Sequence, residues 1–299
     1  MIKKILCLDG GGAKGSIEVA TLKEFEKNTG KPINKTFDLI VGTSVGAIIG
    51  GILSASDLSA DAFLELMKEA LPRVFHHRLR WPIFQPKYNR EILVNVMNKY
   101  IKDKKMKDCH TKYMCTSVNV VDGRTHFFKS WEQKDGETNL IEVINRSYAA
   151  PLFFDSIVDE INNAVWLDGG TGNMNCPLGE AYIELVRQGW ESESVHILSI
   201  GSGYSSFSVP FNKAKNYNNL RQIAYYMNPD DGGLARLQST NTQVEWIKNI
   251  SKCSPNVSFQ RLDCEISNEM NGMDKIKYIN DYIAYGTKMA ADINYKPFI

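Results

Sequence analysis

Short apolar runs that lead into glycine-rich turns dominate the start of the chain. The run at residues 5–8 leads into Asp9 and three glycines, and the run at 37–41 leads into Gly-Thr-Ser-Val-Gly. Short apolar runs are typical of strands buried on both faces of a parallel sheet. Apolar residues at helical spacing follow each turn, over residues 16–28 and 47–54. The order therefore predicts two consecutive βα units.

The same reading predicts further elements along the rest of the chain. Three more helices are expected, at residues 59–71 (ended by Pro72), 90–99 and 139–148. Four more strands are expected, at residues 113–121 and 124–129 (a hairpin around Asp122-Gly123), 165–167 and 195–200. From about residue 218 onward the pattern is mainly helical.

These elements predict a three-layer α/β/α fold, with a largely parallel central sheet and helices on both faces. No internal repeat, low-complexity tract or clear linker divides the chain, so residues 1–299 are expected to form a single domain. Its core covers about residues 3–205, and a mainly helical part covers about 206–299.

Composition narrows the class of protein. The 299 residues are 43% hydrophobic and 23% charged, which is an ordinary globular balance, and the net charge of +1 gives no reason to expect a nucleic-acid partner. The six cysteines form no CxxC pair, and this sparse spacing predicts reduced thiols. No signal peptide or membrane-spanning run is recognisable. The pattern favours a cytoplasmic protein that touches a membrane, if at all, only peripherally.

The first chemistry-bearing motif is the glycine turn Asp9-Gly10-Gly11-Gly12-Ala13-Lys14-Gly15. Its GxGxxG spacing matches a dinucleotide fingerprint, but the second strand does not end in the acidic residue that would hold a ribose. A phosphate-binding P-loop needs its lysine after the last glycine, whereas Lys14 precedes Gly15. A tight glycine turn without any chemical role stays open as an alternative interpretation. The remaining interpretation is that backbone N–H groups at a helix start hold a developing oxyanion.

The second motif is Gly42-Thr43-Ser44-Val45-Gly46, which has the GxSxG spacing of a nucleophile elbow. Such an elbow turns sharply from a strand into a helix and exposes the serine hydroxyl, and its glycines are needed because the turn is crowded. A chance match is the alternative, although the position directly after a buried strand disfavours it.

A serine nucleophile needs a base. Of the five histidines only His196 comes late enough in the chain for a hydrolase triad, and it falls in the middle of a predicted strand. The third motif, Asp168-Gly169-Gly170, follows a short strand and offers a carboxylate instead. Asp-Gly is also a common turn pair, so a structural turn is the plain alternative.

Together the three motifs, in this order, resemble the patatin-like phospholipases. Segments around Tyr148-Ala149-Ala150-Pro151 and Leu198-Ser199-Ile200-Gly201-Ser202-Gly203 also fit, so the resemblance covers about residues 3–205. The tail, with Phe259-Gln260-Arg261-Leu262 and Met273-Asp274, resembles the plant-patatin branch more weakly.

The resemblance implies a serine–aspartate dyad without histidine. Ser44 is then the nucleophile and Asp168 the base, and no metal or cofactor takes part. The amides of Gly10, Gly11 and Gly12 are then the oxyanion donors. The implied supporting residues are Lys14, Gly42, Gly46, Gly169 and Gly170. One departure is Lys14, since the family usually has arginine there, and lysine lacks the planar fork of donors.

The implied activity is that of a serine carboxylic-ester hydrolase acting on acyl lipids, as a phospholipase A or lysophospholipase. The expected partners are a phospholipid or other acyl lipid and, transiently, a membrane surface. Two alternatives stay open: a transacylase that uses the same acyl-enzyme, and a catalytically inert lipid-binding protein.

One segment suggests how such a protein could reach a membrane. No acidic residue lies between Glu69 and Glu91, and this stretch interleaves basic residues such as Arg78 and Arg80 with aromatic ones. Basic and aromatic side chains together favour a lipid interface. The segment is predicted to be a surface loop that acts as an interfacial lid, or else a loop whose aromatic residues pack on the core.

Overall fold

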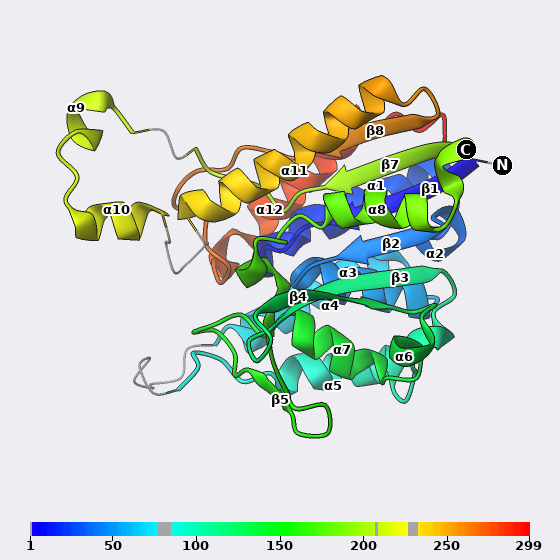
Figure 1. The fold of residues 1–299 in the computed structure, drawn as a ribbon, viewed down its shortest axis with the longest axis horizontal. Helices are drawn as coiled ribbons and strands as arrows, with labels where there is room; N and C mark the ends of the chain where they lie inside the picture. Colours follow the sequence, from blue (N-terminus) through cyan, green and yellow to red (C-terminus); the bar gives the residue numbers. More distant parts are fainter. Residues whose placement is uncertain (1, 77–84, 207–208, 227–232) are drawn as a thin grey trace.

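The computed structural model describes residues 2–76, 85–206, 209–226 and 233–299. Its centre is an eight-stranded sheet (Figure 1). Five neighbouring strands are parallel, in the order β3 (Lys112–Asn119), β2 (Leu39–Gly42), β1 (Ile2–Leu8), β7 (Ser194–Ile200) and β8 (Val257–Leu262). Three further strands join the sheet through antiparallel pairs: β4 (Arg124–Lys129) and β6 (Ala164–Asp168) pair with β3, and β5 (Ile157–Asp159) pairs with β6.

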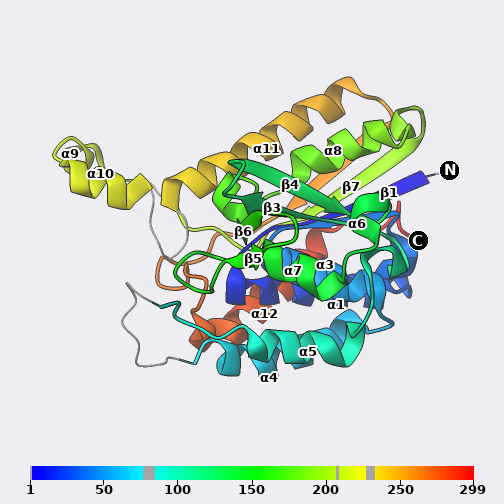
Figure 2. The ribbon, with the colours of Figure 1, turned by 60° about the horizontal axis from the view of Figure 1, so that its bottom comes forward.

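Helices cover both faces of this sheet, as Figure 2 shows. The longer helices of one face are α1 (Gly15–Thr29), α3 (Val45–Ala55), α4 (Ala60–Val74), α5 (Glu91–Ile101), α7 (Leu140–Ser147) and α12 (Ile279–Met289). The other face is covered by α8 (Leu178–Arg187) and α11 (Gly233–Cys253). Shorter helical segments are α2 (Ile33–Thr36), α6 (Gln133–Gly136), α9 (Phe211–Ala214) and α10 (Asn219–Tyr226).

The alternation of side chains along β1 explains why its run is apolar throughout. Leu6 and Leu8 pack into the core on the α1 side, whereas Ile5 and Cys7 pack into the core on the α8 side. Successive strand residues point to opposite faces, so a strand buried on both faces needs an apolar residue at each position. The predicted α/β fold with helices on both faces is confirmed, with a mixed sheet whose central strands are parallel.

One expectation about element boundaries is wrong. Pro72 does not end its helix, because α4 continues to Val74 and Phe75 N donates to Leu71 O at 2.9 Å. Proline removes one helical hydrogen bond, but the buried Leu71 and Val74 keep this last turn on the core. The tail is mainly helical, as expected, and it also contains the strand β8, which pairs in parallel with β7 along six residues. We therefore propose that the tail and the core form one domain.

The segment considered as an interfacial lid is only partly described. Arg78 and Arg80 lie outside the described residues. On its flanks, Phe75 and Tyr88 are buried, with ring centroids 5.0 Å apart in an edge-on contact. These two aromatic side chains pack on the core. Among the described helices, none has the length and apolar character needed to cross a bilayer.

Candidate active site

Strand register brings the second and third motifs together. β2 pairs with the first half of β3 and ends with Gly42 opposite Cys115. β6 pairs with the second half of β3 and ends with Asp168 opposite Ser117, only two residues further along. The turn after β2 carries Ser44. The strands β2 and β6 run toward each other along β3, so the side chains of Ser44 and Asp168 lie close together where the two strands end.

Ser44 has the backbone of a sharp elbow, with φ 55° and ψ −119°. A non-glycine residue rarely adopts positive φ, and such strain is characteristic of nucleophile elbows. Gly46 permits the turn, because a Cβ there would lie 2.5 Å from Leu8 O. Gly42 is equally confined, since a Cβ there would collide with the Gly46 carbonyl. The Ser44 N–H donates to Ser147 Oγ at 3.1 Å, which fixes the start of α3.

Asp168 is buried, with 5% of its surface exposed, and its two oxygens differ. Oδ1 accepts the Gly170 N–H at 2.7 Å, whereas Oδ2 has no hydrogen-bond partner among the described residues. Burial raises the pKa of Asp168 to about 6, against smaller lowering effects from the Ser44 hydroxyl, the Gly170 amide and the Arg236 charge. The Ser44 hydroxyl thus influences the carboxylate while lying outside hydrogen-bonding geometry to Oδ2, which often occurs in an unliganded site.

Gly169 and Gly170 serve Asp168 in different ways. Gly169 packs so closely on Thr116 that a side chain there would collide with the Thr116 hydroxyl, so this glycine lets β6 end against β3. Gly170 supplies the N–H that holds Oδ1. The Asp-Gly-Gly turn therefore orients the carboxylate as well as reversing the chain.

The glycine turn after β1 lies beside Ser44. A Cβ on Gly10 would be 3.1 Å from the Ser44 Cβ. The Gly10 N–H, however, donates to the Asn175 carbonyl at 2.9 Å and is already used. The N–H groups of Gly11 and Gly12 have no acceptor among the described residues. The Gly10 amide is therefore already bound to a carbonyl, and the amides of Gly11 and Gly12 stay candidates among the three expected oxyanion donors.

Residues of the C-terminal tail contact this glycine turn and hold it in place. Lys14 is fully buried and its ammonium donates to Asn271 Oδ1 at 2.6 Å. The Ala13 N–H donates to the Met273 carbonyl at 2.7 Å. Gly12 has φ 62° and lies against Met273, so a side chain at this position would be both strained and blocked. Residues 271–273, which are distant in sequence, thus set the position of the turn.

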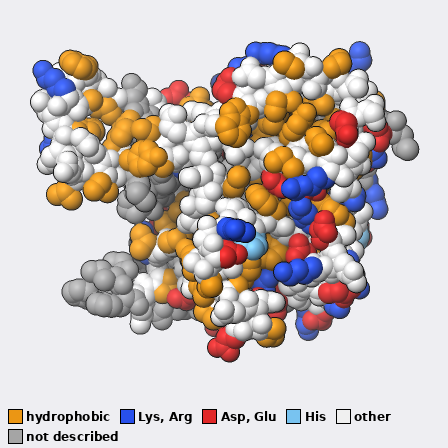
Figure 3. Space-filling model, in the orientation of Figure 1, with side chains coloured by type: hydrophobic (Ala, Val, Ile, Leu, Met, Phe, Trp, Pro, Cys, Tyr) orange, Lys and Arg blue, Asp and Glu red, His pale blue; other side chains and the backbone are white. Residues whose placement is uncertain are grey.

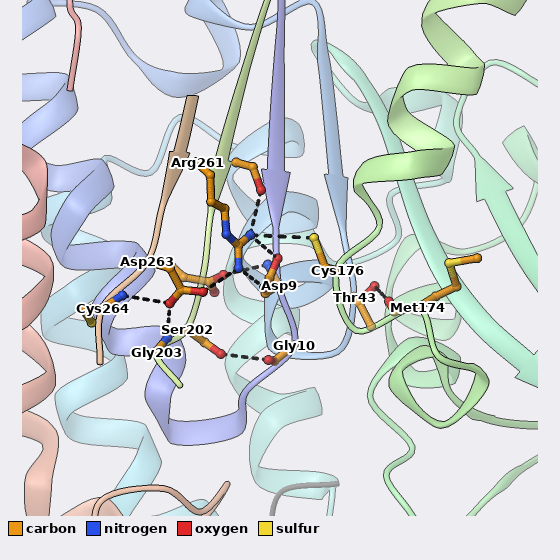
Figure 4. Close-up of polar contacts among 12 residues, drawn as sticks. Asp9, Gly10, Thr43, Met174, Cys176, Ser202, Gly203, Arg261, Asp263 and Cys264 are labelled. Atoms are coloured by element: carbon orange, nitrogen blue, oxygen red, sulfur yellow. Dashed lines mark hydrogen bonds and ion pairs between the residues drawn. The ribbon is translucent and has the colours of Figure 1, made fainter. Parts of the chain in front are cut away.

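Arg261, on β8, binds Asp9 at the start of the same glycine turn (Figure 4). Its guanidinium donates to both carboxylate oxygens of Asp9, at 2.9 and 2.6 Å, and to Asp263 at 2.6 Å. Burial acts to lower the pKa of Arg261, but Asp9 and Asp263 outweigh it and raise that pKa well above its usual value. Burial raises the pKa of Asp9, and Arg261 opposes that rise through its charge and hydrogen bonds. The sequence gives no spacing signal for a pair 252 positions apart.

Removing Arg261 should loosen the glycine turn. The Arg261→Met variant leaves the buried Asp9 and the partly buried Asp263 without their cation, and removing one partner of a buried ion pair typically costs about 3–5 kcal/mol. We expect a lower unfolding midpoint in urea and a lower kcat on a soluble ester, with KM little changed because the acyl pocket is intact. Arg261→Lys keeps the charge and should recover part of the stability but less of kcat. A kcat equal to that of the unchanged protein in both variants would show that Arg261 has only a structural role.

His196, the histidine that comes late enough in the chain for a hydrolase triad, is not placed to serve Ser44. His196 lies opposite Lys4, whereas the glycine turn follows Leu8 opposite Ile200. Four strand residues correspond to about 13 Å, so His196 lies well below the site. Its ring contacts Ser258, and burial lowers its pKa. Geometry therefore disfavours His196 as the base. The described residues also contain no group of three His, Cys, Asp or Glu side chains arranged to hold a metal ion.

Three cavities lie near Ser44 and the glycine turn. An apolar cavity of about 40 Å³ begins at Ser44 and runs between α3 and α4, past Ile48, Leu71 and Phe153. A second apolar cavity of similar size shares Ile48 and Leu71 and continues toward Met97. A polar cavity of about 210 Å³ lies on the other side of the turn, and its lining includes Asp9, Ser202, Arg236, Arg261 and Asn271. An apolar chain and a polar group could thus be accommodated on opposite sides.

Comparison with known proteins places this arrangement in a family. The model of the patatin-like phospholipase family matches residues 6–182, and the chain belongs to that family. Within the matched residues lie all three motifs, including Ser44 and Asp168. The predicted resemblance is confirmed.

Several curated relatives are named as phospholipases or patatins. A cUMP-AMP-activated phospholipase of Escherichia coli is 38% identical over 32% of this chain and 33% of that protein. A cGAMP-activated phospholipase of Pseudomonas aeruginosa is 27% identical over 66% of this chain and 62% of that protein. Patatin-T5 of Solanum tuberosum is 26% identical over 50% of this chain and 42% of that protein. The chain thus matches less than two thirds of the length of each.

Proposed function

We propose that the chain is a lipid acyl hydrolase that cleaves fatty-acyl esters through Ser44 and Asp168. The observation that carries this proposal is the buried Asp168 carboxylate, whose Oδ2 is without a partner among the described residues and lies beside a serine at a strained elbow. The lining of the small cavity that begins at Ser44 is apolar, which suits the first carbons of a fatty-acyl chain. The family and the phospholipase names of the relatives support the same activity.

The proposed reaction has two halves. Asp168 accepts the proton of Ser44 as Oγ attacks the acyl carbonyl carbon, and the resulting oxyanion is held by the Gly11 and Gly12 amides. One such donor typically lowers the barrier by about 2.7–4 kcal/mol. The tetrahedral intermediate collapses, and Asp168 passes the proton to the departing alcohol. Water then gives a proton to Asp168 and attacks the acyl-enzyme, and Asp168 returns that proton to Oγ as the fatty acid leaves, which restores Ser44.

Product analysis on a panel of phospholipids, lysophospholipids and neutral glycerides tests this proposal. Free fatty acid is the expected product, and its partner product identifies the head group and acyl position. Transfer of the acyl group to an added alcohol in place of water would indicate a transacylase. Failure of Ser44 to react with a serine-directed phosphonate, together with no product from any lipid, would indicate an inert lipid-binding protein.

The relatives' names determine one control of this assay. Two of them are named for activation by cUMP-AMP or by cGAMP. Each lipid should therefore be tested with and without these two nucleotides, so that an enzyme that needs an activator is not mistaken for an inert protein. The experiment should also be repeated at several protein concentrations.

The pH dependence of the reaction follows from Asp168. A base must be ionised to accept a proton, and its pKa of about 6 lies above the usual aspartate value of 3.8. We expect kcat/KM for a soluble short-chain ester to rise tenfold per pH unit below about pH 6 and to level off above it. A profile measured from pH 4.5 to 8.5 checks this. A flat profile, in a protein that remains folded throughout, would exclude Asp168 as the base.

A further inference from the structure

An arm formed by residues 209–226 projects from the body of the molecule. It contains α9 and α10 and lies between the end of β7 and the start of α11 (Figures 1 and 2). No side chain of α9 or α10 is buried. The arm is thus an element that contributes nothing to either core cluster, although its sequence is not that of a polar loop.

The arm exposes large apolar side chains. The exposed fractions are 80% for Phe211, 77% for Leu220, 61% for Ile223 and 53% for Tyr226. Leu220, Ile223 and Tyr226 recur at every third position and therefore lie along one face of α10. Figure 3 shows hydrophobic side chains at the surface of this projecting part. Contiguous exposed apolar side chains of this kind mark a surface that binds another partner.

The charged residues of the arm are all basic. Lys213, Lys215 and Arg221 are its charged residues, and no Asp or Glu occurs between Glu193 and Asp230. The whole chain carries 35 basic and 34 acidic residues, so this is a local concentration of positive charge. Two such arms placed together would bring three cations against three, which disfavours pairing between copies of this chain. A negatively charged, apolar partner fits both features.

We propose that the arm at residues 209–226 is a docking element for anionic lipid bilayers. Its apolar side chains enter the interfacial zone while its cations meet lipid phosphates, as in interfacial amphipathic helices. This inference rests on the proposed function, since a lipid acyl hydrolase has to reach its substrate at a membrane.

The position of the arm suits that role. The chain enters it from the carboxyl end of β7, which pairs with β1, and the glycine turn follows β1 at the same end. The chain leaves it into α11, where Arg236 is close enough to influence Asp168. An arm docked on a bilayer would therefore hold the end of the sheet that carries Ser44 toward the lipid.

Co-sedimentation with vesicles containing phosphatidylserine tests the docking element directly. The protein carries Ser44→Ala so that the lipid is not consumed, and the arm variant adds Leu220→Glu and Ile223→Glu. The matched control instead adds Val158→Glu and Ile161→Glu, which are 64% and 97% exposed and lie at β5, at the far edge of the sheet. Both pairs replace exposed apolar residues and add two negative charges.

We expect the arm variant to lose roughly tenfold or more in vesicle partitioning, and the control to change by no more than about twofold. A second arm variant, Lys213→Glu with Lys215→Glu, should lose binding at low salt and differ less from the unchanged arm as salt rises. The rate of hydrolysis of a soluble ester, measured with Ser44 intact, should be the same for the unchanged protein, both arm variants and the control.

Two results would overturn the proposal. One is wild-type vesicle binding by both arm variants at low salt. The other is a change of oligomeric state in light scattering when the arm is mutated, which would make the arm a contact between copies of the chain. If no variant hydrolyses any ester but the arm variants still lose vesicle binding, the docking element stands and the proposed hydrolase function fails.

Discussion

Replacing Ser44 with alanine is expected to reduce kcat on any ester substrate by at least about four orders of magnitude. The acyl-enzyme cannot form without Oγ, and Asp168 then has no serine proton to accept. Stability should change little, because alanine keeps the Cβ and bears the same positive φ as Ser44. Initial rates and urea unfolding midpoints are the two measurements.

The chain offers a matched control in Ser54→Ala. Ser54 is also a buried serine of α3, and its hydroxyl donates to Gly51 O at 3.1 Å, away from Asp168. We expect near-normal kcat for this variant. If Ser44→Ala retained more than about a hundredth of the turnover of the control, another nucleophile would have to carry the reaction.

Replacing Asp168 with asparagine should have the second largest effect on rate, a fall in kcat of roughly three to four orders of magnitude. Asparagine preserves the shape of the side chain and can still accept the Gly170 N–H, but it cannot accept the Ser44 proton. The remaining turnover would come from substrate binding and from the Gly11 and Gly12 amides. Initial rates at pH 8, where Asp168 is ionised, measure the effect.

The same substitution should stabilise the protein, and only at neutral and alkaline pH. The folded pKa of Asp168 is raised from 3.8 to about 6, so the fold favours the protonated form. Above pH 6 the ionised carboxylate then costs about 3 kcal/mol, and this cost fades as pH falls toward the unfolded value. Asp168→Asn should therefore gain up to that amount in urea unfolding at pH 8 and nearly nothing at pH 4.

Asp135→Asn is the control for this pair of effects. Burial also raises the pKa of Asp135, but this carboxylate accepts the Lys129 N–H at 2.9 Å, remote from Ser44. The turnover of the Asp135→Asn variant should stay normal. An Asp168→Asn protein that is both active and no more stable at pH 8 would mean that Asp168 is neither the base nor a strained buried charge.

Local pattern was sufficient to predict the parts of this site that lie close together in sequence. The apolar runs at 5–8 and 37–41 belong to β1 and β2, and the helical spacing after each turn belongs to α1 and α3. The glycines of both turns follow from crowding, which the contact of Gly46 with Leu8 O illustrates. Buried parallel strands and tight turns are specified by neighbouring residues, so sequence reveals them.

Contacts between distant segments could not be predicted in this way. Neither the pairing of Arg261 with Asp9 nor the contact of Lys14 with Asn271 leaves a periodic signal. The strand β8 was missed because six residues with a polar centre do not resemble a buried parallel strand, although its position at the sheet edge explains them. Which amide of the glycine turn is free also depends on a distant partner, the Asn175 carbonyl.

Reaction with a long-chain fluorophosphonate, followed by mass spectrometry of the intact protein and its peptides, tests the central claim most directly. Such a reagent forms a stable adduct with the serine that forms the acyl-enzyme. We predict one adduct per chain, on the peptide that contains Ser44, and a labelling rate that falls in Asp168→Asn by about the same factor as turnover. An adduct on another residue, or unchanged labelling of Asp168→Asn, would contradict it.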